Sequence, residues 1–183
     1  MGFLDIRIEK TERAIKQAFM QLREQKQLEK MRVKDLCDIA HINKSTFYAH
    51  YQDIYELSNA LENSLISDIV ADIPQIQGDN IRERTDWLTQ ELFKAFRRKQ
   101  DEAKILFSGS RQGLFVKRIE EALKKKIGEA DPGYWDDPAR GILLSFCVHG
   151  CYYTFMNNYT QMDERRLLAL LSEIARAAQN INL

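Results

Sequence analysis

Residues 32–57 read RVKDLCDIAHINKSTFYAHYQDIYEL, and the spacing of apolar side chains in this stretch decides the fold. It predicts two short helices around a tight turn, followed by the start of a third helix. Leu36 and Ile39 give the first short helix an apolar side. Phe47 and Tyr51 lie four residues apart and give the second one an inner side. Such a pair of helices is a common device for reading DNA.

The opposite side of the second short helix is polar, as a helix in the major groove of DNA requires. Asn43 precedes this helix and predicts an N-terminal cap, because its side chain can accept a backbone N–H. Lys44 is long, cationic and at the helix start, so it is the best candidate for base or phosphate contact. The predicted DNA-binding residues are Arg32, Lys34, Asn43, Lys44, Ser45, Thr46, Tyr48 and His50.

At these residues the chain resembles the TetR family of bacterial transcriptional regulators. The family's signature reads here as Thr46-Phe47-Tyr48-Ala49-His50-Tyr51, with 53–57 opening a long helix, and the resemblance covers roughly residues 11–61. It implies a dimeric, all-helical protein whose C-terminal domain often binds a small effector. It also implies that Tyr48 and His50 touch phosphates or bases. From the sequence alone, Tyr48 could equally be a half-buried core aromatic.

The chain departs from the family's pattern at three positions. Cys37 stands where Ala is usual, His41 where the turn usually has Gly, and Ile54 where many relatives have a Lys near phosphate. A residue in the left-handed region suits Gly best, and another side chain there is strained by about 1 to 2 kcal/mol. The change at Ile54 lowers the expected affinity for the DNA backbone.

Composition and charge restrict the class of protein. The chain has 183 residues, of which 44% are hydrophobic and 30% charged, with eight Gly and three Pro, a balance typical of a folded helical protein. The formal net charge is zero, but it is unevenly distributed. Residues 1–52 carry +3, residues 53–80 carry −6 and residues 81–183 carry +3. The basic end is the one expected to approach phosphate.

Several other classes of protein are not expected. Three cysteines in apolar helical patterns, without a signal peptide, favour a cytoplasmic protein. The most apolar run, 142–156, is shorter than the roughly 20 residues of a membrane span. No catalytic motif is present, so neither an enzyme nor a cofactor is predicted.

Helical periodicity predicts an all-α fold along the whole chain. We expect an N-terminal three-helix DNA-binding domain with a helix-turn-helix over 1–52, and a C-terminal helical ligand-binding and dimerisation domain over 53–183. A long connecting helix joins them, starting at 53 and ending near Pro74. The predicted helices beside the two short ones are 8–25, 81–99, 101–107, 114–127, 138–158 and 163–179, with a loop over 75–80, a break at 108–110 and a turn at 131–133.

The last two predicted helices are strongly apolar, and the second of them has an apolar stripe wider than one neighbouring helix would cover. Pairing with the same helices of a second chain would bury these stripes in a four-helix interface. A two-fold symmetric DNA-binding protein also needs two recognition helices about 34 Å apart along the duplex. The alternative is that both faces are covered within one chain.

The C-terminal part is rich in aromatic residues, which predicts a ligand cavity. The candidate effector-binding residues are Trp87, Phe96, Phe107, Arg111, Phe115, Phe146, His149 and Tyr153. For each aromatic side chain, ordinary core packing is the alternative. Cys147 and Cys151 share one helix face and are interpreted as packing residues, with a thiol sensor as the alternative. His149 lies about 200° from Cys147 around the helix, so no metal site is predicted.

These patterns lead to one principal functional hypothesis. It is a TetR-like homodimeric regulator, a repressor that leaves a palindromic operator when an unknown small molecule binds the C-terminal domain. The alternative is a co-regulator that kept the fold, acts through protein contacts and has little DNA affinity. A ligand-binding protein without a regulatory role is a third possibility.

Overall fold

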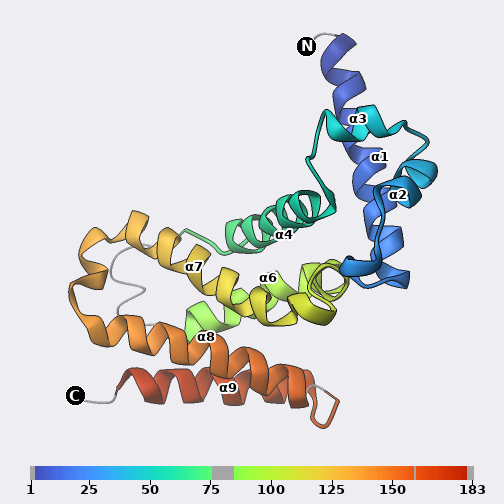
Figure 1. Ribbon diagram of the computed structural model, residues 1–183. Helices are drawn as coiled ribbons and strands as arrows, with labels where there is room; N and C mark the ends of the chain where they lie inside the picture. Colours follow the sequence, from blue (N-terminus) through green and yellow to red (C-terminus); the bar gives the residue numbers. More distant parts are fainter. Residues whose placement is uncertain (1–2, 76–84, 159, 181–183) are drawn as a thin grey trace. The chain divides into compact units, whose positions relative to one another are not determined.

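The computed structural model describes residues 3–75, 85–158 and 160–180, and it confirms the all-α fold, with no strand in these ranges. Figure 1 shows the arrangement of the helices along the chain. The α-helices are α1 (Phe3–Gln25), α2 (Val33–Ala40), α3 (Lys44–Tyr48), α4 (Ile54–Ala71), α6 (Thr85–Leu106), α7 (Gln112–Ala130), α8 (Pro138–Asn158) and α9 (Glu164–Gln179). Short 3₁₀-helices cover Leu28–Lys30, Gly109–Arg111 and Pro132–Asp136.

The chain divides into two compact units. The first unit contains residues 1–65 together with 101–112. The second contains residues 66–100 and 113–183. Helices α4 and α6 therefore each have one end in the first unit and the other end in the second.

Apolar side chains at helical spacing form the core of the first unit. Ile15, Phe19 and Leu22 of α1 are all buried, and α1 packs against α2. Leu36 of α2 and Phe47 of α3 are completely buried beside them. Burying these side chains removes large apolar surfaces from water, which is the main favourable term in folding such a small unit.

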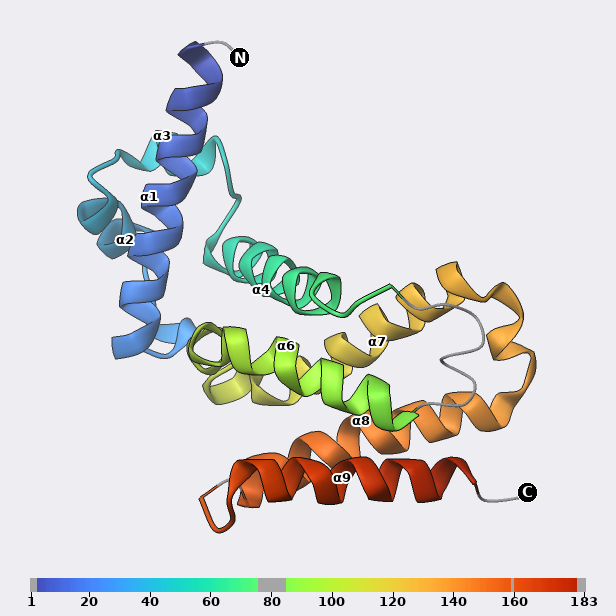
Figure 2. The ribbon, with the colours of Figure 1, turned by 180° about the vertical axis from the view of Figure 1, so that it is seen from behind.

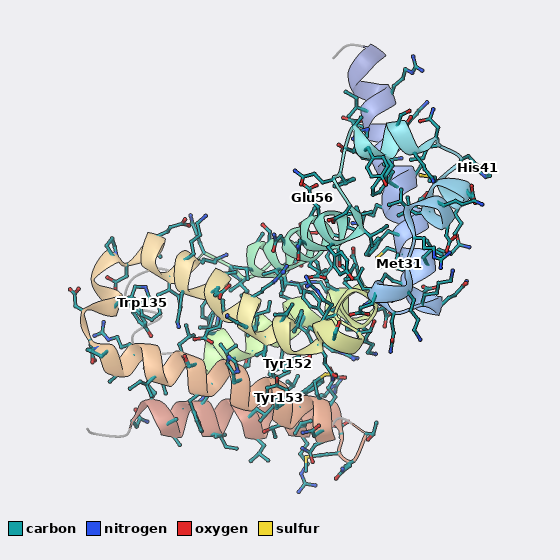
Figure 3. All side chains as sticks on the ribbon, in the orientation of Figure 1. Met31, His41, Glu56, Trp135, Tyr152 and Tyr153 are labelled. Carbon is teal, nitrogen blue, oxygen red and sulfur yellow. The ribbon has the colours of Figure 1, made fainter. Side chains whose placement is uncertain are left out.

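The turn between α2 and α3 has the strained conformation that the sequence predicts. His41 adopts φ 54° and ψ 42°, the left-handed region, and its N–H donates to the carbonyl of Cys37. It has the only positive φ of any non-glycine residue in the described part of the chain. Its side chain is exposed on the outside of the turn (Figure 3). The strain is therefore not compensated by burial of the imidazole.

Replacing His41 with glycine is expected to stabilise the protein. Glycine has no Cβ to strain the left-handed region, and this outweighs its greater freedom in the unfolded chain. We expect a gain of about 0.5 to 1 kcal/mol in the free energy of unfolding, measured by urea denaturation. His41→Ala keeps the strain and serves as the control. A His41→Gly protein no more stable than the alanine variant would contradict the argument.

Residues 101–112 are held in the first unit by buried polar contacts. The Nη2 atom of Arg23 donates to the carbonyl of Leu106 at 3.3 Å and to the hydroxyl of Ser108 at 2.8 Å. Arg111 forms a two-pronged ion pair with the fully buried carboxylate of Glu62, at 2.9 and 2.6 Å. Residues more than 40 positions apart in the sequence are thereby fixed to one another.

In the second unit, helices α6, α7, α8 and α9 surround a shared apolar core. Helices α8 and α9 lie side by side in both ribbon views (Figures 1 and 2) and contact one another. Pro138–Asn158 matches its prediction, and Asp163 caps α9 through the N–H of Arg166 at 3.1 Å. The connecting helix α4 ends at Ala71, slightly before the predicted end near Pro74.

One predicted break is wrong. We expected separate helices over 81–99 and 101–107, but α6 runs without interruption from Thr85 to Leu106. The polar run at 97–102 contains neither Gly nor Pro, and the buried Ala103 and Leu106 continue the inner face beyond it. Most of the predicted loop, residues 76–80, and the predicted helix start at 81–84 lie outside the described residues.

No helix in the described ranges has a stretch both long and apolar enough to cross a membrane.

Candidate nucleic-acid interface and ligand cavity

The helix α3 has one buried side and one exposed side. Phe47 is fully buried, whereas Tyr48, the next residue, leaves 56% of its surface exposed. The Phe47 and Tyr48 rings meet edge to face with their centroids 5.5 Å apart. Of the two sequence interpretations of Tyr48, the core aromatic does not match this exposure. Just over half of its surface is presented to solvent.

Asn43 starts α3 as the sequence predicts. Its Oδ1 accepts the backbone N–H of Thr46 at 2.7 Å and also the hydroxyls of Ser45 and Thr46, each at 2.7 Å. An N-terminal cap of this kind stabilises a helix by about 1 kcal/mol. The cap matters here because α3 has only five residues. It also directs the Ser45 and Thr46 hydroxyls toward Asn43.

Three cations remain available on the surface of this part of the first unit. Arg32 and Lys34 are exposed at the N-terminal end of α2, and Lys44 is exposed at the start of α3. None of the three forms an ion pair with a residue that the structure describes. The neighbouring Asp35 is instead paired with Lys26 at 2.9 Å. Unpaired cations are the groups that phosphate oxygens can recruit without breaking an internal contact.

His50 occupies a different environment from the other predicted DNA-binding residues. Its side chain is only 17% exposed, and Nδ1 lies 3.5 Å from the carboxylate of Glu12 on α1. His50 therefore packs against α1, while Lys44 and Tyr48 extend into solvent. Six of the eight predicted residues are exposed around α2 and α3, whereas Thr46 and His50 are only partly exposed.

The second unit contains an apolar cavity of about 50 Å³, which is partly open to solvent. Helices α6, α7 and α8 supply most of its wall, with Tyr134 from the 3₁₀-helix between α7 and α8. Of the predicted effector-binding residues, Phe96 and Phe115 line it. Their ring centroids lie 5.4 Å apart.

The other six predicted effector-binding residues do not line this cavity. Phe107 and Arg111 belong to the first unit, where Phe107 is buried and Arg111 is paired with Glu62. Trp87 is half-buried on α6 outside the cavity wall. Phe146 and Tyr153 are exposed on α8, at 58% and 44%. Neighbouring residues of a helix point in different directions, which aromatic content alone does not reveal.

His149, the last of the six, belongs to a polar cluster at the contact of α7 and α8. Its Nε2 lies 2.8 Å from Oε2 of Glu120. The other carboxylate oxygen of Glu120, Oε1, accepts a hydrogen bond from the Ser145 hydroxyl and pairs with Lys124 at 2.6 Å. Burial alone would raise the pKa of Glu120. The hydrogen bonds from Lys124, Ser145 and His149 outweigh it and lower that pKa from 4.5 to about 2. The cluster thus holds a carboxylate away from the cavity.

The cavity wall also contains residues that we did not select from the sequence as effector-binding. Both Cys147 and Cys151 line it, one turn apart on α8. Burial raises the pKa of both thiols, that of Cys151 to about 12, so they are neutral at physiological pH. Ile119 and Leu123 of α7 lie one turn apart on the same wall as Phe115. Phe115, Ile119 and Leu123 follow one another at intervals of four residues, and this spacing was the signal in the sequence for a shared inner face.

No model of a known protein family matches this chain, and no curated protein matches it either.

Proposed function

We propose that this protein is a dimeric DNA-binding transcriptional regulator, a TetR-like repressor that leaves its operator when a small molecule occupies the cavity of the second unit. One observation carries the proposal. The short helix α3 buries Phe47 completely while it exposes Lys44 and Tyr48. In this interpretation α2, the left-handed turn at His41 and α3 form a helix-turn-helix, with α3 as the recognition helix.

The exposed groups on α3 suit the edges of DNA bases. In helix-turn-helix proteins the N-terminal residues of the recognition helix reach the base edges. Lys44 is the first residue of α3 and supplies a cation for guanine or phosphate oxygens. Tyr48, one turn later, is 56% exposed and supplies a hydroxyl and an aromatic ring. Arg32 and Lys34, at the positive end of α2, would contact the phosphate backbone.

Exposed apolar residues on the last two helices support dimerisation. On α8, Ile142, Phe146 and Tyr153 are 72%, 58% and 44% exposed and fall within one narrow stripe of the helix. On α9, Leu170 and Ile174 are 48% and 44% exposed, one turn apart. Since α8 and α9 pack together, a second copy could cover both stripes at once. Two copies would present two recognition helices to a palindromic operator.

The proposed effector acts through a shift between two dimer arrangements. A ligand changes an equilibrium only by its difference in affinity for the two states. In one arrangement the recognition helices match successive major grooves, and in the other they do not. A molecule that binds the cavity more tightly in the second arrangement would lower operator affinity. Helix α6 supports this mechanism because Leu88, Phe93 and Phe96 line the cavity. The last turns of the same helix belong to the first unit.

The test is DNA binding by purified protein, using operator fragments selected from the host genome. We expect Lys44→Ala and Tyr48→Ala each to weaken operator binding by about tenfold in gel-shift assays. Lys125→Ala is the matched control, because Lys125 is 79% exposed on α7 and distant in sequence from α3. If the double Lys44→Ala, Tyr48→Ala variant bound the operator as tightly as the parent protein, α3 would not be the reading helix.

The second candidate is a co-regulator that acts through protein contacts. The start of α4 favours it, because Ile54 is buried where a family Lys would approach phosphate, and Asp53 and Glu56 beside it are acidic. Salt separates the two functions. Specific binding through phosphates must weaken steeply between 50 and 200 mM salt, by roughly a factor of ten or more for a few contacts. No measurable binding to any duplex at low salt would favour the co-regulator.

A further inference from the structure

The cavity of the second unit lacks any group that could neutralise a charged ligand. Among the described residues that line it, none is Asp, Glu, Lys, Arg or His. Its polar groups are the hydroxyls of Thr89, Tyr134 and Tyr152 and the two thiols of α8. An ion moved from water into such surroundings would lose its hydration without gaining a counter-ion.

Two carboxylates close in sequence to lining residues of the cavity are already paired. Glu120 follows the lining residue Ile119 on α7, but its carboxylate is held by Lys124, Ser145 and His149. Asp86 comes two residues before the lining residue Leu88 on α6, and it binds Arg176 of α9 at 2.7 Å. Recruiting either carboxylate for a ligand would break an existing ion pair. The cavity is therefore electrostatically neutral as well as apolar.

The thiols and phenols of the wall do not change this conclusion. Cys147 and Cys151 are buried at 7% and 8% exposure, and burial raises the pKa of each thiol. Burial likewise raises the pKa of the Tyr152 phenol. At neutral pH these groups are uncharged hydrogen-bonding partners and polarisable surface. They are suited to a neutral molecule with one or two weak polar groups.

Aromatic rings form one side of the cavity. The rings of Phe96, Phe115 and Tyr152 contact each other, with centroid distances of 5.4 Å for Phe96–Phe115 and Phe115–Tyr152 and 6.2 Å for Phe96–Tyr152. Tyr152 belongs to this cluster and lines the cavity, whereas the adjacent Tyr153 is 44% exposed. A planar ring can stack on or meet the edge of such a wall. Aromatic walls also attract organic cations, so a test must separate these two ligand classes.

We propose that this cavity binds an uncharged, mainly apolar molecule that contains a planar ring, and that it discriminates against anions and cations of the same shape. As an identification of the effector, this rests on the proposed regulatory function. As a statement of binding specificity, it rests only on the residues of the cavity.

The first experiment uses two fluorescent probes that share one ring system. N-phenyl-1-naphthylamine is neutral, and 1-anilinonaphthalene-8-sulfonate adds a sulfonate to it. We expect the neutral probe to bind at least tenfold more tightly to the full chain. A second pair tests the opposite charge, because tert-butylbenzene and phenyltrimethylammonium have nearly the same shape. The neutral compound should displace the bound probe and the cation should not. Equal or tighter binding of either ion would overturn the proposal.

A matched pair of variants tests whether the probe occupies this cavity. Ile119→Trp fills the cavity from α7, whereas Ile8→Trp makes the same change on α1 of the first unit, where Ile8 is 42% exposed. We expect Ile119→Trp to abolish probe binding and Ile8→Trp to leave it unchanged. Probe binding that survives in Ile119→Trp would overturn the cavity assignment.

The unaltered protein offers a second readout, in case Ile119→Trp does not fold. Alkylation by N-ethylmaleimide can be followed at each cysteine by peptide mass spectrometry. Bound N-phenyl-1-naphthylamine should slow modification of Cys147 and Cys151 several-fold. It should not change the rate at Cys37, which is buried in the first unit. Unchanged rates at Cys147 and Cys151, or an equal slowing at Cys37, would contradict binding in the cavity.

The failure of this inference can be told apart from the failure of the proposed function. If the chain binds the neutral probe but no DNA, the ligand class stands and the regulator does not. If it binds an operator but prefers a charged probe, the regulator stands and the ligand class is wrong. If both hold, neutral ligands that displace the probe should also release the operator.

Discussion

Replacing Glu62 with alanine is expected to lower the free energy of unfolding by about 3 to 5 kcal/mol. The Glu62 carboxylate is completely buried and holds the Arg111 guanidinium at 2.6 and 2.9 Å. It also accepts the hydroxyl of Ser58 at 2.7 Å. Removing the carboxylate leaves a mostly buried cation without its charged partner, which costs more than the loss of one ordinary hydrogen bond. Urea denaturation followed by circular dichroism measures the change.

Two controls separate the ion pair from the general effect of replacing a helical glutamate with alanine. Glu121→Ala removes a carboxylate that is 62% exposed and whose ion pair with Lys117 is long, at 4.0 Å. Its effect on the free energy of unfolding should therefore stay within about 0.5 kcal/mol. Replacing both Glu62 and Arg111 with Leu should recover much of the loss, because neither charge then remains buried alone. A loss below about 1 kcal/mol in Glu62→Ala would show that the pair does not hold residues 101–112 in the first unit.

Replacing Ile174 with glutamate is expected to convert the proposed dimer to monomers. The side chain is 44% exposed on α9 in one chain, but a second copy would bury it. A carboxylate buried on each side of a two-fold interface costs several kcal/mol in total, which raises the dimer dissociation constant by a factor of roughly a thousand. Light scattering during size-exclusion chromatography measures the mass of the particle. Operator affinity should also fall when the dimer dissociates, because each monomer contacts only one half-site.

Ile8→Glu is the matched control for this change. Ile8 is 42% exposed on α1, so it introduces the same charge at a similarly exposed isoleucine in the first unit. We expect the Ile8→Glu protein to keep the mass of the parent. If the parent chain were already a monomer at micromolar concentration, or if both variants dissociated alike, the α8 and α9 face would not be the dimer interface.

The local structure of this chain could largely be predicted from its sequence. The cap at Asn43, the left-handed turn at His41 and the bounds of α8 depend on a few consecutive residues. Such features follow from backbone sterics and local hydrogen bonds. The missed continuity of α6 through 97–102 shows the limit of apolar periodicity. A polar run without Gly or Pro keeps its helical propensity, and here the packing of Ala103 and Leu106 sustains the helix.

The cavity was less predictable because α8 is apolar around most of its circumference. Phe146 and Phe155 lie nine residues apart, which places them about 180° from each other on the helix. Phe155 is buried against Phe93, with ring centroids 4.8 Å apart, whereas Phe146 is exposed. Nothing in the sequence distinguishes these two phenylalanines. Only the helices that pack around α8 determine which face is internal.

The sequence by itself determined most of the helices, the cap at Asn43 and the polar outer side of α3, because each of these depends on neighbours within one or two turns. Only the tertiary structure decided that residues 101–112 join the first unit and that Glu62 pairs with Arg111. It also decided which side chains of α6, α7 and α8 enclose the cavity. Contacts between residues tens of positions apart depend on how whole helices pack, and periodicity within one helix does not specify its partner.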